Sequence, residues 1–367
     1  MTERNNDGGI AHKREMTYAA AIREATDQSM EKDSSVFVIG EGVPDPKYVF
    51  GTTKGLVEKY GKARVLDMPL SESGVTGVCI GAALQGMRPI MVHQRLDFLL
   101  LAMDQLVNNA AKWHYMFGGQ MKVPLVIRAI IGRGWGQGAQ HSQNLQAILA
   151  HIPGLKVVMP STAYDAKGLL MASIQDNNPV VFIEHRWLHN VTGYVPEEPY
   201  TVHLGEASVV RKGTDITIAA TSYMTAEALR AATVLEKAGI STEVIDIRTV
   251  KPLDYGKIIE SVKKTGHLLV ADMGYYSVGI AGDVVARVSE EAFDHMTAAP
   301  RRITSPDIPT PSTPALANYY YPRHVDIIKA ACEMVGKRDK AHELLEEEKK
   351  KEPKYLDVPD PSFTGPF

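Results

Sequence analysis

Two acids and a histidine stand where short apolar segments of this sequence end. Glu41 and Glu72 each follow such a segment, and His141 lies in a glycine-rich stretch after a third. Because ligands of parallel sheets bind beyond the carboxyl ends of the strands, we expect these side chains at one site. Each alone has an ordinary explanation, since Glu72 would favour a helix N-terminus and His141 would suit a helix cap or the core. Together they favour a site that moves protons.

The glycine-rich stretch at 132–138 differs from two common phosphate-binding loops. No Gly-Lys-Ser/Thr follows it, as a Walker loop requires. No acid at the end of a next strand supports a dinucleotide site either. The glycines instead predict a loop whose backbone approaches a ligand closely.

Apolar strands alternate with helices along most of the chain, which predicts the α/β class with a parallel sheet covered on both faces. The predicted strands lie at 35–40, 64–68, 88–93, 123–131, 155–160 and 179–184, and then at 215–222, 242–247 and 267–272. A long helix is predicted near 98–116. The alternation of strands and helices breaks at 186–214, so we expect a first α/β domain at 15–197 and a smaller α/β domain at 198–337. We also expect a disordered N-terminus at 1–14 and a charged, proline-rich tail at 338–367.

The composition excludes several classes of protein. With 367 residues, 44% hydrophobic and 23% charged, the chain is typical of a globular protein. A formal net charge of -3 gives no argument for nucleic acid, and no run of eighteen apolar residues predicts a membrane helix. Cys79 and Cys332 lie far apart in apolar helical patterns, as core residues of a reducing compartment do. The polar N-terminus lacks the apolar core of a signal, so we expect a cytoplasmic enzyme.

Several motifs surround the candidate residues, among them Pro69-Leu-Ser-Glu-Ser-Gly, Gly86-Met-Arg-Pro, Ala139-Gln-His-Ser-Gln and Val244-Ile-Asp-Ile-Arg-Thr-Val-Lys-Pro-Leu-Asp. In combination they resemble the β subunit of the E1 component of thiamine diphosphate-dependent 2-oxo acid dehydrogenases of the pyruvate and branched-chain type, in the transketolase superfamily. The resemblance covers roughly residues 16–337. It implies a pyrimidine-binding domain followed by a transketolase C-terminal-type domain.

The resemblance also implies roles for single residues. The glutamate at the position of Glu72 bonds to N1′ of the cofactor's aminopyrimidine ring, and this proton sharing suits a dry pocket that raises a carboxyl pKa. Phe98 would stack on the pyrimidine, although plain core packing also explains it. Leu70 and Gln94 would lie beside the cofactor. The resemblance further gives His141 a contact with substrate and places Glu41 near the same pocket.

The metals and partners of the assembly are implied in the same way. Enzymes of this type hold magnesium and the diphosphate with Gly-Asp-Gly and a later Asn-Asn, and Asn177-Asn178 has no Gly-Asp-Gly upstream. We therefore expect Mg²⁺ ligands from a separate α chain in an α2β2 assembly, with this chain inactive alone and a lipoyl acyltransferase as a further candidate partner. The resemblance also implies K⁺ on oxygens of Leu125, Ser173, Asp176 and Asn178.

The sequence departs from the family at a few polar positions. His93, Gln94 and Arg95 replace less polar residues, and His189 stands where the family commonly has Tyr. Strand alternation would put His93 and Arg95 on one face and Gln94 on the other. Two explanations of the histidines and Arg95 are equally good. They would bind a polar, phosphorylated or sugar-like substrate, or they would form partner contacts or structural ion pairs.

Three functions remain open at this point. The first is a subunit of a 2-oxo acid dehydrogenase that transfers an acyl group to lipoamide. The second is a subunit of a split transketolase-like carboligase that acts on a polar or phosphorylated ketose. The third is a non-catalytic regulatory subunit, which the combination of acid, aromatic residue and histidine disfavours.

Overall fold

The first half of the chain is built around a mostly parallel sheet. The computed structural model describes residues 14–45, 47–134 and 136–351. Within them the first sheet has seven strands, in the order β12 (Thr249–Lys251), β6 (Lys156–Val158), β7 (Val180–His185), β5 (Val126–Ile131), β4 (Arg88–His93), β2 (Val36–Gly40) and β3 (Val65–Leu66). Only β12 runs antiparallel to its neighbour.

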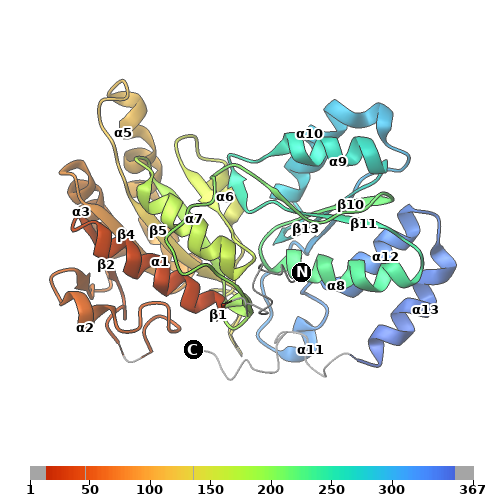
Figure 1. The fold of residues 1–367 in the computed structure, drawn as a ribbon, viewed down its shortest axis with the longest axis horizontal. Coiled ribbons are helices and arrows are strands. Elements are labelled where there is room, and N and C mark those ends of the chain that lie inside the picture. The colour runs from red at the N-terminus through yellow and green to blue at the C-terminus, as the bar shows by residue number, and fades with distance from the viewer. Residues whose placement is uncertain (1–13, 46, 135, 352–367) are drawn as a thin grey trace, which may run out of the picture.

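A second sheet forms the other lobe of the molecule (Figure 1). Its five strands in the described part of the chain have the order β14 (Arg301–Ser305), β13 (Leu268–Tyr275), β10 (Ile216–Ala220), β11 (Thr242–Asp246) and β9 (Ser208–Arg211). β9 alone is antiparallel to its neighbour. The predicted α/β class with parallel sheets is confirmed.

Helices cover both faces of the first sheet because side chains alternate between the faces along each strand. Val38 of β2 faces the core beneath α1 (Tyr18–Lys32) and α7 (Ala163–Gln175). Ile39, the next residue, faces the core beneath α3 (Glu72–Leu84) and α4 (Leu96–Leu99). Thr17 caps the start of α1 by accepting a hydrogen bond from the Ala20 amide.

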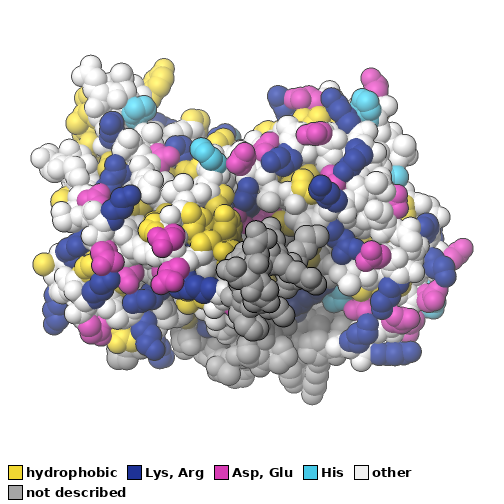
Figure 2. Space-filling model, in the orientation of Figure 1, with side chains coloured by type: hydrophobic (Ala, Val, Ile, Leu, Met, Phe, Trp, Pro, Cys, Tyr) yellow, Lys and Arg dark blue, Asp and Glu magenta, His cyan; other side chains and the backbone are white. Residues whose placement is uncertain are grey.

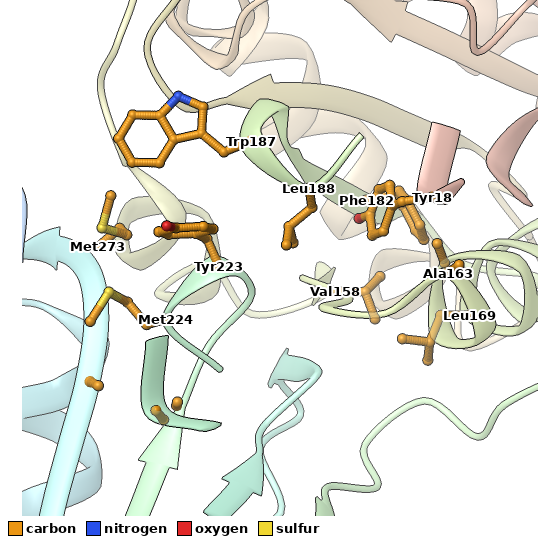
Figure 3. Packing of buried hydrophobic residues seen from close by; sticks show 14 of the residues in the cluster. Tyr18, Val158, Ala163, Leu169, Phe182, Trp187, Leu188, Tyr223, Met224 and Met273 are labelled. Atoms are coloured by element: carbon orange, nitrogen blue, oxygen red, sulfur yellow. The ribbon is translucent and has the colours of Figure 1, made fainter. Parts of the chain in front are cut away.

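Each of these two cores continues into the second lobe. The α1 side merges with residues of α8 (Tyr223–Lys237) and α12 (His324–Met334), and the α3 side with α9 (Tyr255–Thr265) and α10 (Ile280–Ala292). Figure 3 shows the first of these cores, where Trp187 of the first lobe lies near Tyr223 of the second. The two lobes are therefore packed through buried apolar side chains.

Some elements differ from those that the periodicity predicts. The helix expected near 98–116 runs in pieces: α4, a 3-10 turn η1 (Leu100–Ala102), a π segment η2 (Gln105–Ala110) and α5 (Ala111–Met116). Five of the described strands were not predicted: β1 (Glu15–Thr17) and its antiparallel partner β8 (Thr192–Tyr194), together with β9, β12 and β14. The remaining short helical elements are α2 (Leu56–Tyr60), α6 (Gln146–Ala150), η3 (Arg186–Leu188), η4 (Phe293–His295) and α11 (Pro314–Ala317).

The predicted domain limits remain predictions. β12 lies beyond the expected boundary at 197 and yet joins the first sheet. The expectation of disorder at 1–14 falls on residues outside the described part, apart from Arg14, which pairs with Glu24. The charged run of the tail forms α13 (Arg338–Lys349), and the proline-rich end also lies outside the described part.

The visible surface carries both signs of charge. Figure 2 shows acidic and basic side chains intermixed over one face of the molecule. No helix among the described residues has the length and apolar character needed to span a bilayer.

Candidate active site

The two predicted acids meet at the carboxyl edge of the first sheet. β2 pairs in parallel with β3 on one side and with β4 on the other, so the segments that follow these strands emerge together. Glu41 is the first residue after β2, and Glu72 opens α3 after β3. Glu72 is only 8% exposed. The edge of the sheet thus carries a nearly buried carboxylate beside a half-buried one.

The environment of Glu41 shows how closely the acids lie. Burial raises the pKa of Glu41, and the charges of Glu72 and Asp67 raise it further. Its Oε1 atom is buried without a hydrogen-bond partner among the described residues. An uncharged carboxyl is favoured where a second carboxylate is near and water is scarce. The uncharged form of Glu41 is therefore favoured relative to that of a free glutamate.

Hydrogen bonds fix the segments that carry these acids. The Gln94 side chain donates from Nε2 to the backbone oxygen of Glu41 at 2.9 Å, and the Gly42 amide donates to Asp67 at 3.0 Å. Thr76 donates to the backbone oxygen of Glu72 at 2.7 Å and thereby closes the first turn of α3. This hydrogen bond uses the backbone of Glu72 and not its carboxylate.

An aromatic ring and the predicted histidine form the other side of the site. Phe98 of α4 meets His141 edge-to-face, with ring centroids 5.5 Å apart. Gln143 donates to Asp97 at 2.8 Å, which ties the segment after His141 to the start of α4. The structure thus brings Phe98 and His141 together, as it does Glu41, Glu72 and Gln94.

Apolar side chains near the start of α3 are unusually exposed. Leu70 is 85% exposed, and Val78 of α3 and Leu101 of η1 are 64% and 63% exposed. η1 packs against α3. Exposed apolar groups around a site commonly mark a surface that another chain or a ligand covers. Leu70 lies just ahead of Glu72, where the sequence predicts a contact with the cofactor.

Two of the three polar residues proposed for substrate, Arg95 and His189, both contact the Phe50 ring. His93 ends β4 on the face that Met91 shares with the α3 core, and burial lowers its pKa to about 4. We expected side chains to alternate between the two faces of the strand as far as Arg95, but β4 ends at His93. The Arg95 guanidinium instead lies over the Phe50 ring, 5.7 Å from its centroid.

His189 lies on the opposite side of the sheet from α3. Its ring stacks on Tyr18 of α1, and its Nε2 atom lies 3.3 Å from the Glu184 carboxylate. Glu184 is fully buried and paired with Arg128. His189 therefore belongs to an internal ionic cluster in this structure.

The four residues expected around potassium lie at the other end of the strands. Asp176 pairs with Lys156 and accepts a hydrogen bond from the Asn178 amide at 2.8 Å. The backbone oxygen of Leu125 accepts from Val180 at 2.9 Å, and Ser173 donates to Leu169 at 2.7 Å. Among the described residues no group of three His, Cys, Asp or Glu side chains is placed to hold a metal. A K⁺ site built largely on backbone oxygens stays a prediction.

Sequence reasoning named Arg95 as a candidate substrate contact and missed its contacts with the glycine-rich loop. Arg95 donates to the backbone oxygen of Gly132 at 2.6 Å and pairs with the Gln137 side chain. Gly132 has a left-handed φ of 88°, and a Cβ there would lie 2.7 Å from the His185 ring. The sequence offered an arginine, Arg95, and a glycine-rich loop. No periodic pattern indicates that the two are in contact.

Comparisons with known proteins identify the family. The model "Transketolase, pyrimidine binding domain" matches residues 14–191, and "Transketolase, C-terminal domain" matches residues 205–327. The beta subunit of acetoin:2,6-dichlorophenolindophenol oxidoreductase from Cupriavidus necator is 45% identical over 87% of this chain and 97% of its own. The pyruvate dehydrogenase E1 component subunit beta of Rickettsia felis is 41% identical over 86% of this chain and 97% of its own.

A solved structure named "Split gene transketolase, inactive beta4 tetramer" superposes with a TM-score of 0.71 and covers 88% of this chain and 99% of its own, at 24% identity. At that identity it shows the fold alone. The chain belongs to the transketolase superfamily, in the family of β subunits of thiamine diphosphate-dependent 2-oxo acid dehydrogenase E1 components. The resemblance found in the sequence is confirmed, and a β subunit of this kind works with an α partner.

The residues of the site fit the aminopyrimidine half of thiamine diphosphate. A nearly buried carboxylate, Glu72, can share a proton with a ring nitrogen, and the buried Oε1 atom of Glu41 still lacks a partner. Phe98 offers an aromatic ring close by, and Leu70 an exposed apolar side chain. The chemistry of this donor set suits a flat, weakly basic ring with an apolar edge.

Proposed function

We propose that this chain supplies the pyrimidine side of the cofactor site in a two-chain thiamine diphosphate-dependent dehydrogenase. That enzyme would cleave the bond beside the carbonyl of a small 2-oxo acid or hydroxyketone and pass the acyl group to lipoamide. The observation that carries the proposal is the pairing of Glu41 and Glu72 at the carboxyl edge of the sheet, where burial and the Glu72 charge raise the pKa of Glu41.

Each residue of the site has a task in this proposal. When bound, thiamine diphosphate supplies the electron sink for cleaving a bond next to a carbonyl. Glu72 holds a proton at the aminopyrimidine nitrogen, and Glu41, whose pKa is raised by burial and by the Glu72 charge, is the second carboxyl of the site. Phe98 and Leu70 contact the ring, while Gln94 holds the Glu41 backbone in place. His141, an exposed residue whose ring meets Phe98, contacts the substrate and stabilises the charged intermediate.

The other parts of the assembly lie outside this chain. We propose an α2β2 heterotetramer in the cytoplasm in which the α chain provides the Mg²⁺ ligands for the diphosphate. A lipoyl acyltransferase would take up the acyl group. K⁺ at Leu125, Ser173, Asp176 and Asn178 would stabilise the end of α7, away from the chemistry.

The acceptor distinguishes this function from a carboligase. The two relatives described above carry the names of an acetoin oxidoreductase and of a pyruvate dehydrogenase, which supports oxidative transfer over transfer to an aldehyde. Arg95 and His189 both lie against the Phe50 ring, and His189 lies beside the Glu184 carboxylate, which favours structural roles over phosphate binding.

The test is reconstitution of this chain with its α chain, with thiamine diphosphate and Mg²⁺ supplied. Pyruvate, branched-chain 2-oxo acids, acetoin and ketose phosphates are offered in turn, and an artificial dye reports electron transfer without lipoamide. We expect dye reduction by the pair with a 2-oxo acid or acetoin, and none by this chain alone. Turnover only when a ketose phosphate meets an aldehyde would refute the proposal and identify a split transketolase.

A further inference from the structure

The loop that leads to His141 needs support from outside itself. It contains Gly132, Gly134, Gly136 and Gly138, and glycine has more backbone freedom to lose on folding than any other residue. Inside the loop, the Gln137 amide donates to Gly134 at 3.2 Å. The part from Gly136 to His141 is largely exposed. Contacts with the rest of the chain must therefore determine where His141 lies.

Arg95 holds this loop from the first lobe. It is 3% exposed and lies two positions after His93, the last residue of β4. One guanidinium nitrogen donates to the Gly132 oxygen at 2.6 Å, and another pairs with the side-chain oxygen of Gln137. That oxygen also accepts from the Gly134 amide at 2.8 Å. A single cation thus joins both ends of the loop.

Arg133 belongs to the loop and connects it to the second lobe. It is fully buried and donates to the backbone oxygens of Pro311 and Ser312 at 2.6 and 2.5 Å. These residues belong to the segment between β14 and α11. The backbone oxygen of Arg133 accepts from the Trp187 indole at 2.7 Å, which fixes the start of the loop as well.

A second contact repeats this link between the lobes. Thr310, just ahead of Pro311, donates to the Ser142 oxygen at 3.4 Å. Ser312 also lies so close to the loop that a Cβ on Gly138 would be 3.2 Å from its own Cβ. The segment 310–312 therefore contacts the loop on both sides of Gly136, including the residue that follows His141.

We propose that Arg133 is a positioning residue: it ties the loop carrying His141 to segment 310–312, so that the second lobe sets the geometry of the active site. The proposal rests on the role proposed for His141. Charge-assisted hydrogen bonds to two adjacent carbonyls give a cation both strength and direction. A displacement of about 1 Å in a group near the chemistry can lower a rate by roughly 100-fold. Arg95, with its donors on the loop, acts in the same way.

The experiment compares Arg133→Met, Arg133→Lys and the matched control Arg287→Met, an exposed arginine of α10. In the reconstituted enzyme, Arg133→Met should lower kcat about 10- to 100-fold with little change in KM. Arg133→Lys should recover part of the loss, because one ammonium can reach one of the two carbonyls. In the full chain alone, amide hydrogen exchange over residues 132–143 and 307–313 should speed up in Arg133→Met and not in the control.

Two results would overturn the proposal: unchanged exchange over 132–143 in Arg133→Met, or a kcat within about two-fold of the wild type. If Arg133→Met does not fold, Gln137→Ala tests the Arg95 side with the same readouts, and its loss should not add to that of Arg95→Met. If the wild-type pair proved inactive, the proposed function would fail, whereas exchange would still decide whether Arg133 holds the loop.

Discussion

Replacement of Glu72 by Gln separates the proposed chemistry from any structural role of this acid. The change keeps the size of the side chain and removes its charge and its ability to exchange a proton. Proton transfer by a placed side chain contributes roughly 10²- to 10⁴-fold to a rate, which is about 3–5 kcal/mol. We expect kcat/KM of the reconstituted enzyme to fall within that range.

The stability of the chain should change little in the same variant. Thr76 bonds the backbone oxygen of Glu72 and not its carboxylate, so the first turn of α3 keeps its hydrogen bond. Loss of a favourable charge at the helix N-terminus costs about 0.3–1 kcal/mol. Relief of the repulsion that raises the pKa of Glu41 acts in the opposite direction. The net effect on the free energy of unfolding should lie within about 1 kcal/mol.

The assay follows dye reduction by the reconstituted pair, together with urea unfolding of the chain and binding of thiamine diphosphate. Glu290→Gln on the exposed side of α10 is the matched control and should change none of them. Activity of Glu72→Gln within three-fold of the wild type would refute the proton-holding role. A loss of activity accompanied by an equal loss of stability would mean that Glu72 serves the fold.

Two further predictions concern stability. Glu184→Gln should destabilise the chain by about 3–5 kcal/mol in urea unfolding, because fully buried Arg128 would lose its counter-charge. Glu31→Gln at the surface should change it by less than about 1 kcal/mol, and similar losses in both would refute this account. Burial opposes a charge on His324, but its hydrogen bond to Glu227 raises the pKa overall. The resulting stabilisation should be present below about pH 6.5 and lost as pH rises through the raised pKa. His324→Gln should remove that part of the pH dependence, and an unchanged profile would contradict it.

Several parts of the site could be predicted from the sequence because they depend on local order. An acid placed directly after an apolar strand must lie at the edge of the sheet, so Glu41 and Glu72 could be assigned to one site. The resemblance assigned Phe98 and His141 to the same cofactor site, and the structure joins these two rings. In each case a short segment fixes where the side chain lies relative to its own strand.

Other features depend on where the chain goes after a strand ends. The alternation of side chains along β4 ends at His93, so the sequence pattern could not predict the contacts of Arg95 with Phe50 and Gly132. His189 likewise lies on the α1 side of the sheet, where Glu184 binds it, and not beside Glu72.

The sequence by itself determined the α/β class, the family and the sheet edge that carries the proposed site, because periodicity and motifs are local properties. Only the tertiary structure decided that the Glu72 charge raises the pKa of Glu41, since that effect depends on distance and on the exclusion of water. It also decided the contact of Arg133 with Pro311, which lies 178 positions away along the chain. Hydrogen bonds between residues so far apart exist only once both lobes have folded and packed together.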